Sequence, residues 1–594
     1  MFTTRPELLG TYGMVSSTHW LASSAGMAVL ERGGNAFDAA VAAGLVLQVV
    51  ESHLNGPGGE VSIVLYGAEQ DEALVVCGQG VAPKAATIEH FKGLGLELVP
   101  GTGLLPACVP GAFDAWMLLL LELGTFPLRS VMEQAIAYAG GGYPLVPRIS
   151  GTIAVVQDLF AEEWRSSAEI YLPDGRVPAP GTIFRNPSLA ATYARIVDEA
   201  EAAASDRNGQ IEEARRLFYR GFVAEAIDDF CRNTDVIDVS GKRNRGILTA
   251  DDLAAWQATR EPPIAFDYAD HRVFKTGPWG QGPVFLQQLS LLEGFDLATM
   301  AHNGADYVHT VVECAKLAFA DREAWYGDPA MVDVPLDALL DDRYVRQRRE
   351  LVSDRASWEL RPGAPDGRDP RLMRVPKVDA EGAWASSGAG EPTVARTGES
   401  GGDTCQIDVV DRWGNLVAAT PSGGWLQSSP VIPGLGFCLG TRGQMFWLEE
   451  GLPNSLAPQK RPRTTLTPTI AIGERERLAF GTPGGDTQDQ WSLNFFLAHV
   501  HFGLNLQEAI DAPMFHTTHF PSSFFPRSSN PGQIVVEGRF DADVVRALEE
   551  RGHEVVVEED WSLGRLSAVG YEPQRGVLKA AANPRGMQGY AVGR

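Results

Sequence analysis

The chain has 594 residues, 44% of them hydrophobic, and carries a formal net charge of −25 at pH 7. This apolar fraction is typical of a globular protein with a large core, whereas the negative charge argues against nucleic acid and anionic membranes as partners. No run of about 18 apolar residues occurs, and no basic segment precedes an apolar core, so we expect neither a membrane span nor a signal peptide, and a cytoplasmic location.

The N-terminal region predicts two helices, a glycine loop and a strand. The first helix, Ala22–Arg32, is rich in small residues and ends at a glycine pair. The second, Ala39–Val50, has Asn35 or Asp38 as its cap. The glycine loop Asn55–Gly59 precedes a strand rather than a helix and is followed by no lysine, so its pattern disfavours a phosphate-binding loop.

The middle of the chain predicts helices and then a linker. Leu128–Ala139 is an amphipathic helix, and residues 185–350 are mostly helical, with a strand at Ile264–Phe274. Residues 355–403 are rich in proline, glycine, alanine, serine and charge, which predicts an extended or mobile linker. A structureless stretch of this length inside a compact protein is unusual and often functional.

A β-hairpin is predicted directly after this linker. Its strands, Ile407–Val410 and Leu416–Thr420, flank a tight polar turn. Thr404 stands at the head of the first strand. If the chain were cut before Thr404, this one residue would supply both a nucleophilic hydroxyl and, through its new α-amino group, a base. An ordinary hairpin after a linker is the alternative interpretation.

The remainder of the chain is β-rich. It also contains helices near Gln490–His501 and Asp541–Arg551, and strands Glu554–Val557 and Leu566–Tyr571 close the chain. A helical first part and a β-rich second part, joined by a linker, suit an α/β fold of the four-layer αββα sandwich type, made by two pieces of one chain.

Four segments together resemble the γ-glutamyltransferase family. They are GGNAFDAAVAAGLVLQVVESHLNGPGGE, the hairpin VVDRWGN, KRPRTTLTPTI and the loop TPGGD. The resemblance implies the N-terminal nucleophile hydrolase fold and a precursor that cuts itself between Asp403 and Thr404. The products are a large subunit, residues 1–403, and a small subunit, residues 404–594. The family register places the nucleophile at Thr404, and the neighbouring Cys405 is the alternative.

The resemblance also implies a mechanism. The freed α-amino group of Thr404 has a reference pKa of about 7.7–8.0, so it can take the hydroxyl proton while the hydroxyl attacks a substrate amide. An acyl-enzyme forms, and water or an amine resolves it. Ser422 matches the family's second threonine, which hydrogen-bonds the nucleophile. The backbone N–H groups of Gly484 and Gly485 match the donors that stabilise the oxyanion.

The charged anchors for a γ-glutamyl group are replaced in this sequence. Gln79 stands in place of the arginine that holds the substrate α-carboxylate, and Trp447 in place of the aspartate that holds the α-ammonium group, although Gln444 is kept. Losing both charges removes the charge-assisted contacts that recognise a zwitterionic amino acid. The alternative is that Arg442 or Arg463 has taken over the anchoring.

Other segments point to one branch of the family. Thr464 and Thr465 match the family's paired serines that hold the donor substrate, although strand propensity alone also explains them. The TPSGGWLQSSP and LGTRGQMFW runs resemble the amidohydrolase branch, and an oxamate amidohydrolase is its most similar member. Oxamate is a small anionic amide without an ammonium group, so it would fit a pocket that has lost the aspartate.

The sequence therefore predicts a self-processing amidohydrolase for a small carboxylate-bearing amide, without metal or cofactor. The alternatives are a true γ-glutamyltransferase or glutathione hydrolase, an acylase for larger apolar acyl groups, and an uncleaved non-catalytic scaffold. His516 and His519 have HxxH spacing but no acidic or cysteine partner, so they do not indicate zinc. The expected partners are the substrate and the two subunits; assembly into a homo-oligomer is left open.

Overall fold

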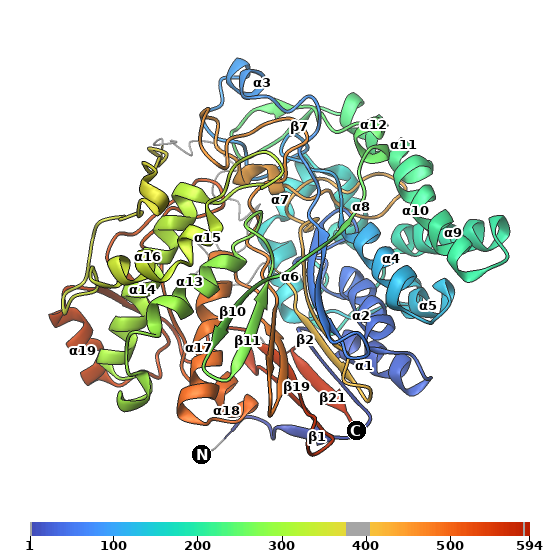
Figure 1. The fold of residues 1–594 in the computed structure, drawn as a ribbon. Coiled ribbons are helices and arrows are strands. Elements are labelled where there is room, and N and C mark those ends of the chain that lie inside the picture. The colour runs from blue at the N-terminus through green and yellow to red at the C-terminus, as the bar shows by residue number, and fades with distance from the viewer. Residues whose placement is uncertain (1–2, 376–403, 586–587) are drawn as a thin grey trace.

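A computed structural model describes residues 3–375, 404–585 and 588–594, which form a mixed α/β fold with two seven-stranded sheets (Figure 1). We call the first the hairpin sheet. Its strands, in spatial order, are β21 (Tyr590–Gly593), β2 (Gly13–Ser17), β12 (Ile407–Asp411), β13 (Leu416–Ser422), β3 (Glu60–Gly67), β4 (Glu72–Gly78) and β9 (Thr259–Glu261). The predicted hairpin is thus confirmed and forms the centre of this sheet.

The second sheet also combines strands from both sides of the predicted linker. In spatial order it contains β1 (Leu8–Gly10), β20 (Val577–Ala582), β19 (Ser567–Glu572), β15 (Arg477–Gly481), β14 (Thr469–Gly473), β11 (His271–Lys275) and β10 (Ile264–Tyr268). All neighbouring strands in the two sheets are antiparallel. The segments before residue 376 and after residue 403 are therefore interleaved in both sheets.

Helices cover the outer face of each sheet (Figure 1). Against the hairpin sheet lie α1 (Trp20–Glu31), α2 (Ala36–Val50) and α4 (Ala112–Leu123), and α5 (Leu128–Gly141) packs on α2. Against the second sheet lie α13 (Gly282–Leu292), α17 (Gln488–Phe502) and α18 (Leu506–Asp511), and α14 (Ala305–Trp325) packs on α13. A third apolar cluster joins the two sheets, for example Val410 of β12 with Ala479 of β15.

The remaining elements lie around this core. The helices are α3 (Ile88–Gly93), α6 (Pro147–Val155), α7 (Gln157–Glu162), α8 (Arg165–Tyr171), α9 (Pro187–Ala203), α10 (Arg207–Arg220), α11 (Phe222–Asn233), α12 (Ala250–Ala254), α15 (Leu336–Leu339), α16 (Asp342–Arg349) and α19 (Ala542–Glu550). The short strands are β5 (Tyr143–Pro144), β6 (Ile183–Phe184), β7 (Val236–Ile237), β8 (Arg243–Asn244), β16 (Phe515–Thr517), β17 (Gln533–Val536) and β18 (Glu554–Val557).

Several predicted elements differ from the observed ones. The second helix begins at Ala36 rather than Ala39, because Asn35 caps it by accepting a hydrogen bond from the Asp38 N–H. The strand expected at Ile264–Phe274 is two strands, β10 and β11. Two strands, β20 and β21, follow the last one predicted; β20 is alanine-rich, so its strand conformation comes from pairing with β1 and β19 rather than from propensity.

The predicted linker is described only in part. Residues 355–375 contain a single short 3₁₀ turn, Pro365–Gly367. Residues 376–403, which include Asp403 of the predicted cleavage site, lie outside the described residues.

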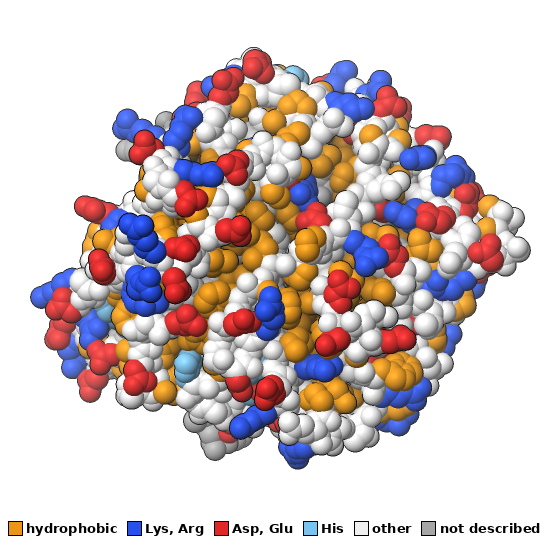
Figure 2. Space-filling model, in the orientation of Figure 1, with side chains coloured by type: hydrophobic (Ala, Val, Ile, Leu, Met, Phe, Trp, Pro, Cys, Tyr) orange, Lys and Arg blue, Asp and Glu red, His pale blue; other side chains and the backbone are white. Residues whose placement is uncertain are grey.

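Charged side chains of both signs are spread over the surface. Figure 2 shows acidic and basic groups interspersed on one face, without a large region of a single sign. In the described part of the chain, no helix combines the length and the apolar character needed to span a bilayer.

The carboxylate of Asp411 fixes the hairpin turn and joins it to α2. It accepts hydrogen bonds from the N–H groups of Trp413 (2.9 Å) and Asn415 (3.1 Å) and, at the start of α2, from the N–H of Ala36 (2.9 Å). Asp411 and the Ala36 N–H are buried, so this donor at the start of α2 would lose its acceptor if the carboxylate were removed. The turn therefore depends on this one side chain for its conformation.

We expect Asp411→Ala to lower the free energy of unfolding by about 1–3 kcal/mol, because it leaves the buried Ala36 N–H without its acceptor and removes the hydrogen bonds that hold the turn. Asp267→Ala, in the β10–β11 hairpin, is the control. Its side chain is 74% exposed, so its effect should stay below about 0.5 kcal/mol. Urea denaturation of the two variants measures the difference; equal midpoints would contradict this role of Asp411.

Candidate active site

Thr404 lies at the head of the hairpin and faces the space between the sheets. It forms an antiparallel bridge with Ser422, both residues are fully buried, and their hydroxyl oxygens are 3.3 Å apart. Side chains alternate along an extended chain, so Thr404 shares its face with Gln406 and Asp408. Asp408 accepts a hydrogen bond from Ser567 of the second sheet, which shows that this face lies between the sheets.

Cys405 points to the opposite face of the hairpin sheet. Its Sγ contacts Glu51 Oε2 at 2.9 Å and Asn55 Nδ2 at 3.1 Å, and the residue belongs to the apolar cluster under α2. Burial, followed by the negative charge of Glu51, raises the pKa of the Cys405 thiol well above its ordinary value. A buried, protonated thiol is a poor nucleophile, so the geometry favours Thr404.

Ser422 is held by a buried ion pair. Arg442, at the start of a short 3₁₀ helix (Arg442–Met445), donates from Nη2 to Ser422 Oγ at 2.9 Å and from Nε to Glu60 Oε1 at 2.6 Å. The rings of Trp425 and Phe524 lie 5.5 and 5.7 Å from the guanidinium carbon. The charged guanidinium of Arg442 thus hydrogen-bonds directly to Ser422, which is the partner of Thr404.

The loop between β15 and α17 presents two backbone N–H groups. Thr487 donates to the Gly484 carbonyl from its N–H (3.0 Å) and its Oγ1 (2.7 Å). In a trans peptide the C=O and N–H point in opposite directions, so the Gly485 N–H is directed away from Thr487. Both glycines are buried, and neither N–H donates to an acceptor among the described residues. Such a pair of donors is suited to a developing negative charge.

Glycine is required at the first of these positions. Gly484 has φ +136°, and a Cβ there would lie 2.4 Å from Thr487 Oγ1 and 2.5 Å from the Trp491 ring. The carbonyl of Gly485 accepts a hydrogen bond from Gln281 Nε2 at 3.1 Å. Both peptide groups of this loop are therefore fixed before any ligand is bound.

Gln444 and Trp447 lie on the same short segment as Arg442, and each has a partner. Gln444 donates to Thr441 Oγ1 (3.0 Å) and accepts from the Phe525 N–H (3.1 Å). The guanidinium of Arg527 stacks on the ring of Trp447, with its central carbon 4.1 Å from the ring centroid. The aspartate expected in γ-glutamyl enzymes is thus replaced by an aromatic ring that binds a cation.

Gln79, Thr464 and Thr465 are buried. Gln79 Nε2 donates to the Gly80 carbonyl at 3.0 Å, while its Oε1 has no hydrogen-bond partner among the described residues. Thr464 is held by its N–H, which donates to Trp279 at 2.9 Å. Thr465 Oγ1 has no partner in the described part of the chain. The hydrogen bonds identified for Gln79, Thr464 and Thr465 within the described ranges go to other residues, so their assignment to the substrate site stays a prediction.

Sequence reasoning did not find several residues around the site. Glu60 orients Arg442, and Thr487 and Gln281 fix the glycine loop. Arg527 lies in the loop before β17, where no motif or periodicity marks it. The predicted alternative anchors Arg442 and Arg463 are both paired with carboxylates.

Histidines form a separate buried cluster. His309, Glu313 and His553 have the composition of a metal site, but Lys316 donates to Glu313 at 2.7 Å and the two imidazoles bond each other at 2.8 Å. His519, which lies in the HxxH segment, accepts from the Gly532 N–H at 3.0 Å. Several of the ring nitrogens and the Glu313 carboxylate thus already have protein partners.

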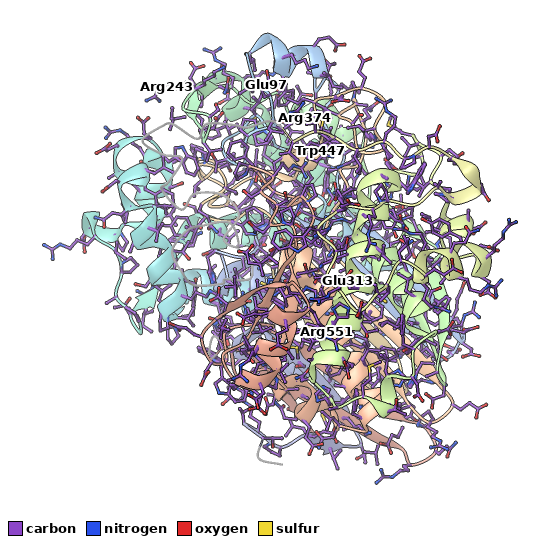
Figure 3. The ribbon with its side chains drawn as sticks, turned by 90° about the vertical axis from the view of Figure 1, so that its left-hand side faces the viewer. Glu97, Arg243, Glu313, Arg374, Trp447 and Arg551 are labelled. Carbon is purple, nitrogen blue, oxygen red and sulfur yellow. The ribbon has the colours of Figure 1, made fainter. Side chains whose placement is uncertain are left out.

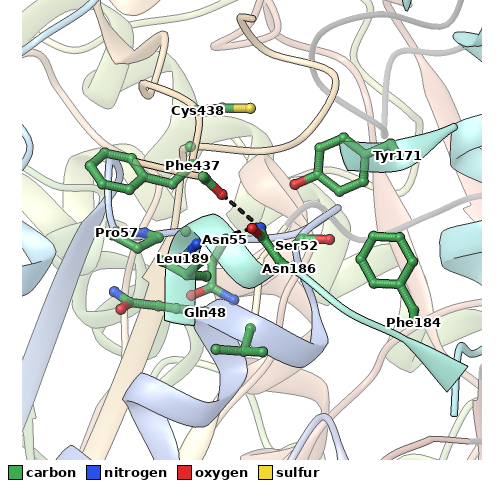
Figure 4. A pocket seen from close by; sticks show the side chains of 14 residues that line it. Gln48, Ser52, Asn55, Pro57, Tyr171, Phe184, Asn186, Leu189, Phe437 and Cys438 are labelled. Atoms are coloured by element: carbon green, nitrogen blue, oxygen red, sulfur yellow. Dashed lines mark hydrogen bonds between the residues drawn. The ribbon is translucent and has the colours of Figure 1, made fainter. Parts of the chain in front are cut away.

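A small enclosed cavity lies behind the glycine loop Asn55–Gly59 (Figure 4). Asn186 closes one wall by donating to the Gly436 carbonyl at 2.7 Å. Gln48 Nε2 and Ser52 Oγ line the cavity and have no hydrogen-bond partner among the described residues. A cavity with such polar walls is suited to ordered water.

Comparison with known proteins supports the resemblance found in the sequence. A sequence model of the Gamma-glutamyltranspeptidase family matches residues 22–593. The chain belongs to this family. Its members are hydrolases and transferases, and the chain is an enzyme of this γ-glutamyltranspeptidase type.

Solved structures share the whole fold. The structure of LmbA2991HD is 57% identical, with a TM-score of 0.93, and each chain covers 100% of the other. The cephalosporin acylase from Bacillus halodurans is 28% identical, with a TM-score of 0.81, and the match covers 100% of this chain and 97% of that one.

Curated relatives are described as proenzymes. The glutathione hydrolase-like YwrD proenzyme of Bacillus subtilis is 31% identical over 99% of both chains. The oxamate amidohydrolase proenzyme of Klebsiella pneumoniae is 28% identical over 98% of this chain and 99% of the relative. Members of the γ-glutamyltranspeptidase family similar to this chain are thus made as precursors and differ in substrate.

The opposite orientations of Thr404 and Cys405 give a direct test. Cys405→Ala should leave self-cleavage intact, because the thiol lies on the helical side of the sheet, whereas Thr404→Ala should remain a single chain. Denaturing electrophoresis and N-terminal sequencing of the smaller fragment measure both outcomes. Loss of cleavage in folded Cys405→Ala, or a fragment that begins with Cys405, would contradict the assignment.

Proposed function

We propose that this member of the γ-glutamyltranspeptidase family is a self-processing amidohydrolase for a small amide that carries a carboxylate. The observation that carries the proposal is the buried pair of hydroxyls, Thr404 and Ser422, 3.3 Å apart at the head of the hairpin. The unpaired N–H groups of Gly484 and Gly485 support it, because acyl transfer from an amide needs both a nucleophile and oxyanion donors.

Processing is proposed between Asp403 and Thr404. Thr404 Oγ1 attacks the carbonyl of residue 403, the peptide bond becomes an ester, and water hydrolyses it to free the Thr404 amine. The products are residues 1–403 and 404–594. We assign the two facing sheets and their outer helices to the four-layer αββα sandwich of N-terminal nucleophile hydrolases. Both sheets contain strands of each product, so the products stay associated.

The same atoms would act on the substrate. The α-amino group of Thr404 takes the hydroxyl proton, and the oxygen attacks the amide carbonyl. The Gly484 and Gly485 N–H groups stabilise the oxyanion. The amine leaves with the proton, and water then resolves the acyl-enzyme. Ser422, held by the charged Arg442, accepts a hydrogen bond from the Thr404 hydroxyl and keeps the nucleophile oxygen in position.

The groups around the site favour an anionic substrate without an ammonium group. Gln79 offers no charge, and Trp447 is stacked against Arg527, so the described residues of this segment present a cation where an ammonium-binding carboxylate would be needed. A relative of the same length is an oxamate amidohydrolase. A glutathione hydrolase activity is less well supported, although a relative carries a glutathione hydrolase-like name, because it requires those anchors.

An acylase for large apolar groups is the remaining enzymatic alternative. It would require exposed aromatic walls. Trp425 and Trp447 are instead 1% and 2% exposed and are engaged by Arg442 and Arg527. These rings position guanidinium groups, which favours a small anionic substrate over an apolar one.

Gly484→Ala should lower turnover on the order of 10²–10³-fold, because the added Cβ displaces the peptide that carries an oxyanion donor. Gly503→Ala is the matched control: Gly503 also has a positive φ (+66°), but a Cβ there meets nothing within 4 Å. Turnover per cleaved molecule is measured for both variants. Thr487→Val, which removes the Oγ1 bond without a clash, should give a smaller loss. Unchanged turnover in both loop variants would contradict the oxyanion role.

The substrate assignment is tested by kcat/KM for oxamate and for glutathione on the cleaved enzyme. Each missing hydrogen bond to a charged group is worth roughly 1.5–3 kcal/mol, so two missing anchors should reduce γ-glutamyl turnover by orders of magnitude. We expect oxamate to be the better substrate. A clear preference for glutathione would replace the proposal by the glutathione hydrolase alternative.

A further inference from the structure

Arg527 is a fully buried cation without a carboxylate partner. It is 1% exposed and forms no ion pair with any described carboxylate. Three of its five N–H groups donate to backbone carbonyls: Nη1 to Ser522 (3.2 Å) and Nη2 to Gln444 (2.9 Å) and Phe446 (3.2 Å). The Nε–H is buried and has no acceptor within the described ranges. Two donors of this guanidinium are therefore unused.

The charges around Arg527 do not balance. Arg322 pairs with Asp486 and Glu323, and Arg463 pairs with Glu323. Together with Arg527 this makes three guanidinium groups and two carboxylates, all buried or nearly so. Burial, followed by the repulsion of Arg463, lowers the pKa of the Arg527 guanidinium to about 9. A buried charge without a counter-ion is costly, so one more anion would stabilise this cluster.

The other arginine beside the site differs in this respect. Arg442 has Glu60 as its counter-ion and donates to Ser422. Its charge is therefore already neutralised, and it acts on the nucleophile pair. Arg527, which donates to the Gln444 and Phe446 carbonyls of the same Arg442–Trp447 segment, has no such counter-ion in the described part of the chain.

We propose that Arg527 binds the carboxylate of the substrate in the cleaved enzyme. This inference rests on the proposed function and names the group that selects its substrate class. The ligand is an acyl amide whose acyl part ends in a free carboxylate and carries no ammonium group. Its carboxylate accepts from the Nε–H and from the second Nη1 N–H, while the ring of Trp447 holds the guanidinium plane.

The position of Arg527 supports this role. It lies on the loop Ser522–Arg527, which joins the two halves of the site: Ser523 donates to Asp486, next to Gly485, at 2.6 Å, and the Phe525 N–H donates to Gln444 at 3.1 Å. Its φ of +68° is unusual for an arginine and is held by these contacts. The same loop thus ties the glycine loop to Gln444, whose carbonyl accepts from the Arg527 guanidinium at 2.9 Å.

The charge beside residue 447 is opposite in sign to the charge that the family resemblance implies there. The resemblance places an ammonium-binding aspartate at residue 447, whereas the structure has an aromatic ring that carries a guanidinium. In the single chain Met373 and Val375 pack against Trp447, which Figure 3 shows beside Arg374. The assignment therefore concerns the cleaved enzyme, in which the chain after Val375 is no longer joined to Thr404.

The experiment measures oxalate binding to cleaved enzyme by titration calorimetry. Arg527→Gln should weaken binding by about 10–100-fold, because it removes a charge-assisted contact. Arg539→Gln is the matched control: Arg539 also stacks on a tryptophan, Trp561 at 3.4 Å, and its partner Glu537 keeps Arg585. Oxalate affinity should not change in this control.

Kinetics separate binding of the carboxylate from a structural effect. Arg527→Gln should raise KM for oxamate more than it lowers kcat, and should leave kcat/KM for the neutral analogue oxamide unchanged. Arg527→Lys, which keeps the charge but not the planar fork, should bind oxalate with intermediate affinity. Equal losses for oxamate and oxamide would show a structural role and overturn the inference.

Failure of this inference can be distinguished from failure of the proposed function. Arg527-dependent oxalate binding by an enzyme that does not hydrolyse oxamate would overturn the proposed substrate and leave the anion site in place. Unchanged oxalate affinity in Arg527→Gln would overturn the anion site. If Arg527→Gln does not cleave itself, unchanged oxalate affinity in cleaved Arg527→Lys would overturn the anion site in the same way.

Discussion

The alternation of side chains along the strand that begins at Thr404 sets the geometry of the site. It directs the threonine hydroxyl between the two sheets, 3.3 Å from Ser422, and the thiol of Cys405 into the helical layer. A slip of one residue in the pairing of β12 and β13 would exchange these faces and separate the two hydroxyls. The turn that fixes this register, held by Asp411, therefore matters for the chemistry although it does not touch the substrate.

Buried charges connect this hairpin to the loops around it, and they do so in two different ways. On the side of Ser422 the charges of Glu60 and Arg442 cancel, and the remaining donor positions a hydroxyl. A pair of this kind costs desolvation and is retained only where its geometry is good. On the side of Trp447, Arg527 has no counter-ion among the described residues. The cost of burying a charge, which explains the first pair, therefore favours an anionic ligand at the second. In the proposed function, Arg442, whose charge is balanced by Glu60, positions the nucleophile. Arg527, whose charge is not balanced by a described carboxylate, selects the substrate.

Local patterns predicted the parts of the structure that local interactions determine. The hairpin follows from alternation and turn residues, and α2 follows from helix propensity, although its start depends on which of two residues caps it. Family membership followed from four motifs in order. The ion pairs did not follow, because Glu60 and Arg442 are 382 residues apart and only the fold brings them together. Arg527 was not found because a single arginine in a loop carries no periodicity; its meaning lies in the missing counter-ion, which only packing reveals.

The segments before residue 376 and after residue 403 are interleaved in both sheets. This arrangement explains how the backbone nitrogen of Thr404 could become a free amine, and thus a base, without loss of the fold. The hairpin strands β12 and β13 lie between β2 and β3, so the segment after residue 403 fills the centre of a sheet whose adjacent strands belong to the segment before residue 376. Removing it would expose unpaired strand edges and open apolar clusters on both faces of the sheet. A cut before Thr404 breaks one covalent bond and none of these contacts. Because the packing outweighs the loss of that single connection, the chemistry at Thr404 can change from amide to amine while its neighbours stay in place.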